Sequence, residues 1–480
     1  MKPLQGFGVR KCMKIIELKN SFNPATFCDN QRLIRNQKFK VMKQKILMVI
    51  VIGLTVFSGF SQNFDKAKLD AYFENLERND KFMGSVAVSR NGEIIYTRSV
   101  GFADVENKLK ANENSKYRIG SISKTFTTVL VMKAVEEKKL VLNQTINKFF
   151  PEIKNAEKIT VANLLYHRSG IHSFTDDKEY LTWNTQPKTE KELLDIIIKG
   201  GSDFEPDSKS AYSNSNFVLL TFIVEKSFGK PYKVLVDELI AKPAGLKNTA
   251  LGGKIDTGKN ECKSYKFLGQ WNVEPETDIS VPLGAGGIVS TPSNLVNFSD
   301  ALFGGKLVSK ESLEQMQTVN GQYGMGLFKI PFYDKTGFGH TGGIDGFSSV
   351  FIHFTDENIS YAMISNGTNF NNNNISIAVL SAVFGKDFEI PEFNTFKVDA
   401  ETLEKYVGIY ASTQIPLKIT ITRNNETLVA QATGQSAFPL EATAADKFKF
   451  EQAGVVMEFN AAENSMVLKQ GGGVFNYKKE

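Results

Sequence analysis

The sequence contains a serine and a lysine at a spacing that fits nucleophilic catalysis. In "YRIGSISKTFTTVLVMKAVEEKKL" (117–140), Ser121 follows Gly120, and Lys124 comes three residues later. The apolar spacing after Ser121 predicts an amphipathic helix, and a separation of three residues places both side chains on one face of it. A serine hydroxyl becomes a nucleophile only when a base takes its proton. Taken alone, however, the pattern favours a helix-capping serine followed by a solvated lysine.

A second Ser-x-x-Lys pattern shows how weak this spacing is by itself. Ser227 and Lys230 also stand three residues apart. Between them, Gly229 occupies a position where a helix should end, and Pro231 follows, which together predict a helix C-cap. We therefore interpret this second pair as structural.

Two further segments change the interpretation of the first pair. Tyr212 and Asn214 precede an apolar helical run, and "HTGG" (340–343) begins a predicted strand. In this order, Ser-x-x-Lys, Tyr-x-Asn and His-Thr-Gly resemble the three-part signature of the serine β-lactamase and penicillin-binding-protein superfamily. The second motif is similar to that of the class C β-lactamase and DD-peptidase branch. "ITVANLLYHRSGI" and "LGAGGIVSTPSNLVNF" also resemble class C-like serine hydrolases, so the likeness extends over residues 81–385.

The resemblance implies a role for each matching residue. Ser121 would be the acylated nucleophile, and Lys124 its base or the partner of that base. Tyr212 would be the second proton-transfer group, and Asn214 a contact for the substrate amide. The oxyanion hole would consist of the backbone N–H groups of Ser121 and Gly343. The other residues implied at the site, along its edge strand, are His340, Thr341 and Gly342.

The proposed base must have an unusual pKa. Free lysine titrates near 10.4 and tyrosine near 10, so each would need its pKa lowered by about 3 units to act as a base near neutral pH. Burial or a cationic neighbour lowers the pKa of lysine, and a cationic neighbour lowers that of tyrosine. If Lys124 and Tyr212 are in contact, they titrate as a pair, and the sequence leaves open which of them is the base.

Two positions depart from the family pattern. His340 stands where many members have lysine, so attraction for a substrate carboxylate would be weaker and would depend on pH. Members with histidine here resemble DD-peptidases, D-aminopeptidases and esterases, and the glutamate of class A deacylation has no recognisable counterpart. Asp207 stands where the family usually has glycine, in the loop before Tyr212.

Other kinds of site are not indicated. His167 and His172 are interpreted as organisers of a loop, and His353 as a strand residue. Four scattered histidines without an HExxH motif or cysteine pairs predict no metal site. No G-x-S-x-G, Walker or dinucleotide-binding pattern occurs, so we expect no cofactor.

Charge and targeting signals suggest an exported protein. The 480 residues carry a formal net charge of +5, but residues 1–61 contain 11 Lys and Arg against 2 Asp and Glu. The rest of the chain therefore has 46 basic and 50 acidic residues, which argues against nucleic-acid binding. Lysines followed by an apolar run from Ile46 to Phe57, then Gly59 and Ser61, predict a signal peptide over 42–61.

The predicted signal determines the expected location. We expect a periplasmic or extracellular protein with no stable membrane partner after cleavage. The alternative is an uncleaved anchor, although this run of about a dozen apolar residues is short against the roughly 20 that span a bilayer. Residues 1–41 precede the signal and are interpreted as a non-native extension. Cys262 is the sole cysteine after residue 61, so no internal disulfide is expected.

Periodicity predicts an α+β fold for residues 62–385. A helical pattern covers 64–76, and Asn91-Gly92 between two β-rich runs predicts a hairpin. The segment from Leu140 to about Asn320 is mostly helical, and strands around 356–358 precede a final helix in "NISIAVLSAVFG". Strands at both ends with helices between them predict an antiparallel sheet flanked by helices, with an all-helical subdomain. The resemblance implies a β-lactamase/transpeptidase-like arrangement.

The C-terminal part has a different pattern. Residues 386–399 are predicted to be a linker. Within 400–480, seven short β-rich runs recur about every 8–12 residues, which predicts a small β-barrel domain without catalytic residues.

Three functional hypotheses remain from the sequence. The first is an exported serine hydrolase that forms an acyl-enzyme on Ser121 and cleaves an amide or ester, with D-amino acid peptides among its substrates. The second is a β-lactamase or penicillin-binding sensor with slow turnover, and the third is a catalytically inactive scaffold. In each active case the partner is a small-molecule or peptide substrate.

Overall fold

The computed structural model describes residues 64–393 and 396–480. The predicted N-terminal extension (1–41) and signal peptide (42–61) lie outside these residues. In the described parts of the chain, no helix is both long and apolar enough to cross a bilayer. Within the same residues, His, Cys, Asp and Glu side chains form no group of three or more that could hold a metal ion.

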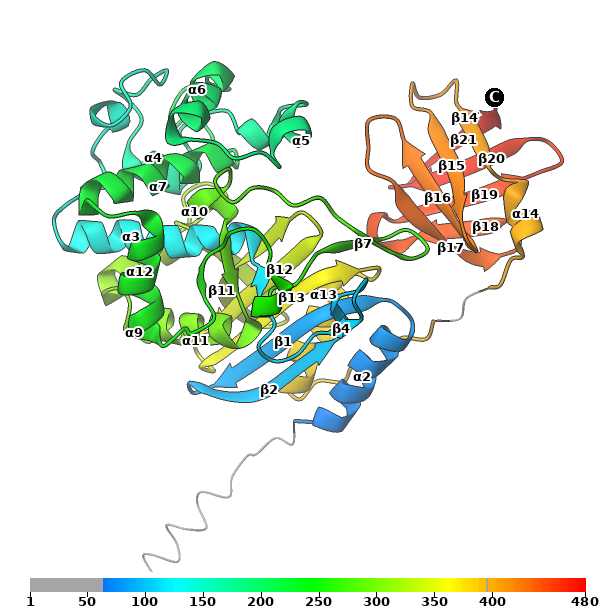
Figure 1. The fold of residues 1–480 in the computed structure, drawn as a ribbon, viewed down its shortest axis with the longest axis horizontal. Coiled ribbons are helices and arrows are strands. Elements are labelled where there is room, and N and C mark those ends of the chain that lie inside the picture. The colour runs from blue at the N-terminus through cyan, green and yellow to red at the C-terminus, as the bar shows by residue number, and fades with distance from the viewer. Residues whose placement is uncertain (1–63, 394–395) are drawn as a thin grey trace, which may run out of the picture. The chain divides into compact units, whose positions relative to one another are not determined.

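A six-stranded antiparallel sheet forms the base of the first domain (Figure 1). Its strand order is β10-β11-β12-β13-β1-β2, so β1 pairs with β13 and joins the N-terminal hairpin to the last four strands of the domain. This brings the strand that carries the third motif, β11, into the same sheet as the N-terminal hairpin. The strand bounds are β1 (Phe82–Arg90), β2 (Glu93–Val100), β10 (Phe328–Phe332), β11 (Lys335–Ile344), β12 (Phe347–Phe354) and β13 (Ile359–Thr368).

Turn chemistry sets the register of this sheet, as the sequence predicts. Asn91 and Gly92 connect β1 to β2, and both have positive φ angles, 55° and 78°, which a tight type I′ hairpin requires. Asn358, with φ of 49°, ends the turn between β12 and β13. β1 is buried along nearly its whole length, because it lies inside the sheet and is covered on both faces.

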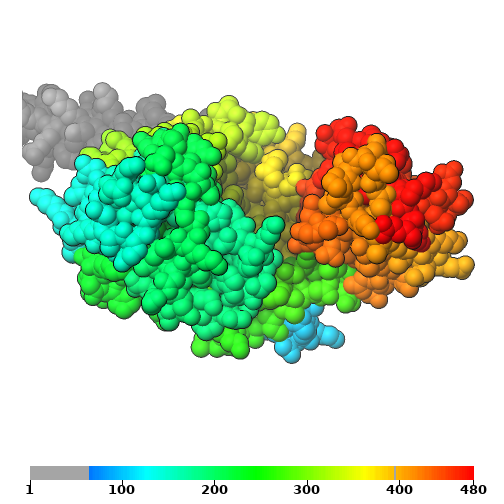
Figure 2. Space-filling model, turned by 90° about the horizontal axis from the view of Figure 1, so that it is seen from above, coloured from blue at the N-terminus to red at the C-terminus, as the bar shows by residue number. Residues whose placement is uncertain are grey.

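Some helices pack on the sheet, and others form a separate helical subdomain. α2 and α13 contact each other and the sheet, while α11 packs on β1, β12 and β13. The helical insertion, cyan to green, is continuous in both views (Figures 1 and 2). The main helices are α2 (Lys66–Arg78), α3 (Ser123–Glu136), α4 (Val161–Leu165), α5 (Tyr180–Trp183), α6 (Glu190–Gly200), α7 (Asn214–Phe228), α8 (Tyr232–Val236), α10 (Leu283–Gly286), α11 (Pro292–Phe303), α12 (Lys310–Gln317) and α13 (Asn372–Val383).

The helix after the nucleophile differs from the prediction. α3 is buried on nearly every side rather than amphipathic, and even Thr125, Thr127 and Thr128 are fully buried. It packs against α7 and α10, so it has no solvated face. The threonine hydroxyls are satisfied by backbone carbonyls, for example Thr125 by Gly326 at 2.7 Å, which allows polar residues inside the core.

The C-terminal residues form a closed antiparallel barrel, orange to red in Figure 1. It has eight strands where the sequence pattern shows seven, because the four-residue β14 is too short to give a periodic signal. Its Tyr410 pairs with Lys479 of β21 and so closes the barrel. The strands are β14 (Gly408–Ala411), β15 (Ile419–Asn424), β16 (Thr427–Ala432), β17 (Phe438–Ala444), β18 (Lys447–Phe450), β19 (Val455–Asn460), β20 (Ser465–Gln470) and β21 (Gly473–Lys479).

Candidate active site

Ser121 lies in a tight turn rather than in α3 itself. The chain leaves β5 (Tyr117–Arg118), forms one 3₁₀ turn, η1 (Gly120–Ile122), and then enters α3. Gly120 has a φ of 49°, and a Cβ there would lie 2.7 Å from the backbone nitrogen of Gly343. Glycine is therefore required both for the backbone conformation and for the close approach of β11.

The side chain of Lys124 is held by three oxygen atoms. Its Nζ lies 2.9 Å from Ser121 Oγ, 2.7 Å from Asn214 Oδ1 and 2.7 Å from the carbonyl oxygen of Ala285 in α10. Two of these atoms can only accept a hydrogen bond, whereas the serine hydroxyl can donate one. An uncharged amine satisfies all three contacts by donating to Asn214 and Ala285 and accepting from Ser121.

The environment of Lys124 favours this uncharged form. The side chain is fully buried, and no carboxylate among the described residues forms an ion pair with it. Burial lowers the pKa of Lys124 well below its usual range, because the ammonium loses its hydration without gaining a counter-ion. The lone pair of Nζ is then available to the hydroxyl of Ser121.

Tyr212 approaches the same oxygen from another side. Its hydroxyl forms a hydrogen bond with Ser121, while its ring faces Lys124, whose Nζ lies 4.8 Å from the ring centroid. Burial raises the pKa of Tyr212 above its usual value, and the contact with Ser121 offsets this only in part. The tyrosine is therefore a protonated phenol at neutral pH. Of the two groups, the uncharged lysine is the one that can accept a proton.

His167 positions Tyr212. From the sequence, this histidine was expected only to organise a loop. The imidazole stacks on the tyrosine ring with centroids 4.4 Å apart. Its Nδ1 accepts a hydrogen bond from the backbone N–H of Ser213 at 3.1 Å, and its carbonyl accepts one from Ala211 at 2.9 Å. Both neighbours of Tyr212 in the chain are thus fixed by one residue. Burial lowers the pKa of His167 well below its usual value, so the ring is neutral.

Asn214 is tied to the loop that precedes α6. Its Nδ2 donates to Thr175 Oγ1 at 2.9 Å, and its backbone N–H donates to Ser173 Oγ at 3.0 Å. One amide hydrogen remains for a substrate, because the amide has two. The loop is held in turn by His172, which pairs with Asp177 at 3.2 Å and with a second aspartate, and these carboxylates raise the pKa of His172.

The third motif lies on β11 directly beside the nucleophile. A Cβ on Gly342 would overlap the carbonyl oxygen of Ile119 and lie 3.0 Å from the backbone nitrogen of Ser121. Side chains alternate along a strand, so His340 and Gly342 share the face toward Ser121. Thr341, expected to line the site with His340, is exposed, and strand alternation places its side chain on the other face of β11 from His340. Its hydroxyl makes no hydrogen bond to any residue the structure describes.

His340 is neutral, and its tautomer follows from its contacts. Nδ1 lies 2.5 Å from the carbonyl oxygen of Thr341, which can only accept, so Nδ1 carries the proton and Nε2 is an acceptor. The ring is 2% exposed and stacks on Phe328 at 4.2 Å. Burial, together with the nearby Lys124, lowers the pKa of His340 to about 3. The ring is therefore uncharged at neutral pH.

The remaining sequence predictions have clear outcomes. Gly229, with φ of 65°, caps the C-terminus of α7, which confirms that the Ser227 pattern is structural. Asp207 has the left-handed conformation suited to glycine, with φ of 66°, and Arg168 Nε bonds its carboxylate at 2.5 Å. His353 lies in β12, as predicted for a strand residue. It is buried, and its Nδ1 lies 2.9 Å from Ser360 Oγ.

The fold and these contacts agree with the comparison to known families. A model of the Beta-lactamase family matches residues 69–384. The chain belongs to the beta-lactamase family. It is a serine hydrolase of that family, and its resemblance to the class C-like branch is borne out.

Individual beta-lactamase-family relatives extend this result. The chain is 26% identical over 440 residues to "Penicillin-binding protein 4*" of Bacillus subtilis (strain 168), covering 84% of this chain and 96% of that protein. A D-stereospecific amidohydrolase from Streptomyces sp. has a TM-score of 0.58 and 28% identity, covering 66% of this chain and 99% of that one.

One further relative shows the fold over a longer span. The octameric penicillin-binding protein homologue from Pyrococcus abyssi has a TM-score of 0.60 and 23% identity, covering 86% of this chain and 100% of that chain. This coverage agrees with the α+β domain followed by an eight-stranded barrel.

Proposed function

We propose that the protein hydrolyses amides or esters of D-amino acids through an acyl-enzyme on Ser121, with Lys124 as the base and Tyr212 as the acid. The observation that carries the proposal is the contact set of Lys124. Two oxygens that can only accept hold its N–H groups, and its third contact is the serine hydroxyl. This arrangement suits an uncharged amine that removes the proton from Ser121.

In the first step, Ser121 Oγ forms a bond to the substrate carbonyl carbon while its proton moves to Nζ of Lys124. The carbonyl π electrons move to oxygen, and the resulting oxyanion accepts hydrogen bonds from the N–H groups of Ser121 and Gly343. The close approach of Gly120 and Gly342 to the neighbouring backbone supports this placement.

In the second step, the tetrahedral intermediate expels an amine or alcohol. The leaving atom takes the phenolic proton of Tyr212, and the proton on Lys124 restores the phenol. Water then attacks the acyl carbon and gives one proton to Nζ of Lys124. The bond between Ser121 Oγ and the acyl carbon breaks, Oγ takes that proton back, and the acid product leaves. Splitting the reaction in this way divides one difficult barrier into two lower ones.

His340 supports a substrate without a carboxylate beside the scissile bond. A lysine at this position would present a positive charge, whereas the neutral histidine offers an uncharged acceptor at Nε2. Such a site suits amides and esters better than peptides with a free C-terminal carboxylate or β-lactams. The similarity to a D-stereospecific amidohydrolase supports the D configuration. We further propose export, on the basis of the signal pattern over 42–61.

The chain contains its own control for the nucleophile. We expect purified protein to react with a labelled fluorophosphonate, and Ser121→Ala to abolish labelling, whereas Ser227→Ala, in the second Ser-x-x-Lys pattern, should leave it unchanged. D-alanine amide and D-alanine nitrophenyl ester should be hydrolysed faster than a chromogenic cephalosporin. A stable penicillin adduct with no hydrolysis of either D-alanine derivative would instead favour a penicillin-binding sensor.

The substrate preference has a separate test at one residue. His340→Lys restores a cation at the third motif. We expect it to raise kcat/KM for a peptide ending in D-alanine carboxylate relative to D-alanine amide, by about tenfold, because one charge contact is gained. Equal changes for both substrates would contradict the role given to His340.

A further inference from the structure

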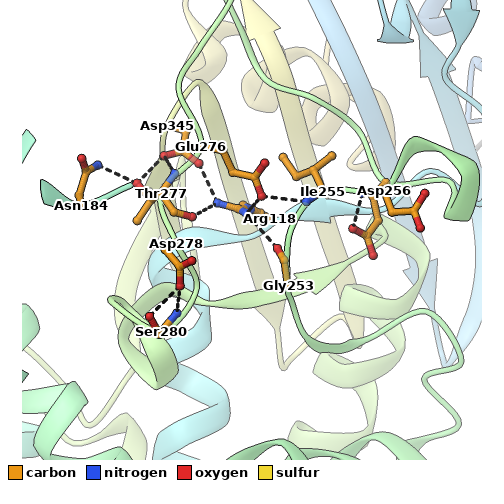
Figure 3. Close-up of polar contacts among 11 residues, drawn as sticks. Arg118, Asn184, Gly253, Ile255, Asp256, Glu276, Thr277, Asp278, Ser280 and Asp345 are labelled. Atoms are coloured by element: carbon orange, nitrogen blue, oxygen red, sulfur yellow. Dashed lines mark hydrogen bonds and ion pairs between the residues drawn. The ribbon is translucent and has the colours of Figure 1, made fainter. Parts of the chain in front are cut away.

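A buried arginine connects the nucleophile turn to the end of β11. Arg118 precedes Ser121 by three residues, and its side chain is 1% exposed. Its Nη1 donates to the carbonyl oxygen of Thr277 at 2.6 Å and to Asp345 Oδ2 at 3.0 Å. Its Nη2 donates to Glu276 Oε1 at 2.5 Å and to a backbone carbonyl, that of Gly253, at 3.0 Å (Figure 3).

Asp345 is held as firmly as the arginine. It follows Gly343 by two residues, has a φ of 52°, and its carboxylate is 3% exposed. While Oδ2 accepts from Arg118, Oδ1 accepts from the backbone N–H of Thr277 at 3.0 Å and from its hydroxyl at 2.6 Å. Asn184 donates to the same hydroxyl at 2.9 Å, so the network joins five separate parts of the chain, at 118, 184, 253, 276–277 and 345 (Figure 3).

Between the hydrogen bonds of Arg118 and those of Asp345, the turn that carries Ser121 and strand β11 contact each other through backbone atoms alone. A Cβ on Gly342 would lie 3.0 Å from Ser121 N, and one on Gly120 would lie 2.7 Å from Gly343 N. No side chain can therefore adjust the gap between the two proposed oxyanion donors. The gap is bounded on one side by Ser349 Oγ, which donates to the carbonyl of Ile119 at 2.8 Å. On the other side it is bounded by the network of Arg118.

We propose that Arg118 and Asp345 are positioning residues that set the separation between the backbone N–H groups of Ser121 and Gly343. This inference rests on the acyl-enzyme function proposed above. Arg118 donates to four oxygen atoms through Nη1 and Nη2, whereas its buried Nε has no hydrogen-bond partner among the described residues, so its role is to hold these segments rather than to contact the substrate. A lysine could not reproduce the planar fork that reaches four acceptors at once, so even the conservative substitution should loosen the connection.

The test separates transition-state binding from substrate binding. Variants Arg118→Lys and Asp345→Asn would be compared with Lys263→Met, which breaks another ion pair with a buried aspartate, that of Asp104, away from Ser121. We expect both network variants to lower kcat for the nitrophenyl ester by about 10²-fold, the effect of losing one oxyanion donor, with KM changed less than about threefold. A boronic acid, which forms a tetrahedral adduct on serine, should lose affinity in parallel.

The outcomes are distinct. Lys263→Met should lower the Tm but leave kcat and boronate affinity unchanged, and the double variant of the network should lose no more than either single one. Folded Arg118→Lys and Asp345→Asn proteins with normal kcat and boronate affinity would overturn the inference, as would an equal loss in Lys263→Met. Asp345→Asn is isosteric, so it tests the connection even if arginine variants fail to fold. Failure of the acyl-enzyme function itself would appear separately, as retained labelling in Ser121→Ala.

Discussion

Acidification should destabilise the first domain steeply, because three of its histidines are buried and neutral. Burial lowers the pKa of His340 to about 3 and that of His353 to about 4, and lowers the pKa of His167 well below its usual value. In the unfolded chain all three titrate near 6.5. As the pH falls through about 6.5, the unfolded state therefore binds protons that the folded state does not, and the free energy of unfolding decreases.

The size of the effect follows from the number of protons. At about pH 5.5 each unfolded histidine is roughly 90% protonated, so unfolding takes up about 2.7 protons, and each is worth about 1.4 kcal/mol per pH unit. The three histidines should then lower the free energy of unfolding by about 4 kcal/mol per pH unit between about pH 6 and 5, and Lys124, uncharged when folded and charged when unfolded, adds to this loss. His172, whose pKa is raised, is protonated in both states there and contributes little. Most carboxylates remain ionised in both states above about pH 5.

The assay is urea unfolding followed by tryptophan fluorescence at a series of pH values. Both tryptophans, Trp183 and Trp271, lie in the first domain, but the hairpin of Trp271 bonds the barrel residue Asn424, so its share of the signal also reports on that contact. His340→Gln should reduce the slope by about 1.2 kcal/mol per pH unit, one histidine's share, whereas His172→Gln should leave it nearly unchanged. The neutral state of these histidines would be refuted if the free energy of unfolding changed by less than about 1.4 kcal/mol per pH unit, the value for one proton. It would also be refuted if His340→Gln left this dependence on pH unchanged.

Three further predictions concern the reacting groups. Lys124→Met should abolish fluorophosphonate labelling yet raise the Tm by about 2–4 °C, because it removes a buried amine that lacks a counter-ion; a lowered Tm in a calorimetric scan would contradict this. Tyr212→Phe keeps the stack on His167 but removes the proposed acid. Hydrolysis of D-alanine amide should therefore fall by at least about 10²-fold more than that of the nitrophenyl ester, because the nitrophenolate leaving group needs no proton. Equal losses for the two substrates would argue against an acid role. Gly342→Ala should lower the acylation rate by at least about 10²-fold in stopped-flow measurements, because its methyl group meets the backbone of Ile119, and a normal rate would show that the strand can shift freely.

The main chemistry was predictable from the sequence because it resides in short, ordered motifs. Ser121 and Lys124 are three residues apart, and local geometry alone brings them together. Tyr212 needed the family order of the motifs, since 90 residues separate Asn214 from Lys124 and only the fold joins them. The exact protonation state was out of reach, because it depends on burial, which a sequence does not show.

The supporting residues were harder to predict for the same physical reason. Arg118 bonds residues 135 to 227 positions away, and nothing in its local sequence indicates these partners. His167 was expected only to organise a loop, yet its ring and carbonyl fix both neighbours of Tyr212. Thr341 was expected at the site because of its motif, and its role there stays a prediction.

The contact between Gly342 and the nucleophile turn also limits how this protein can be re-engineered. Because the two backbones touch there, a mutational library at 120 or 342 would consist almost entirely of inactive members. Useful diversity should instead be introduced at 181–183, outside the hydrogen bonds of the Arg118 network. Asn184 and Thr277, which bond each other within that network, should be kept, because they help to hold the spacing of the two backbones.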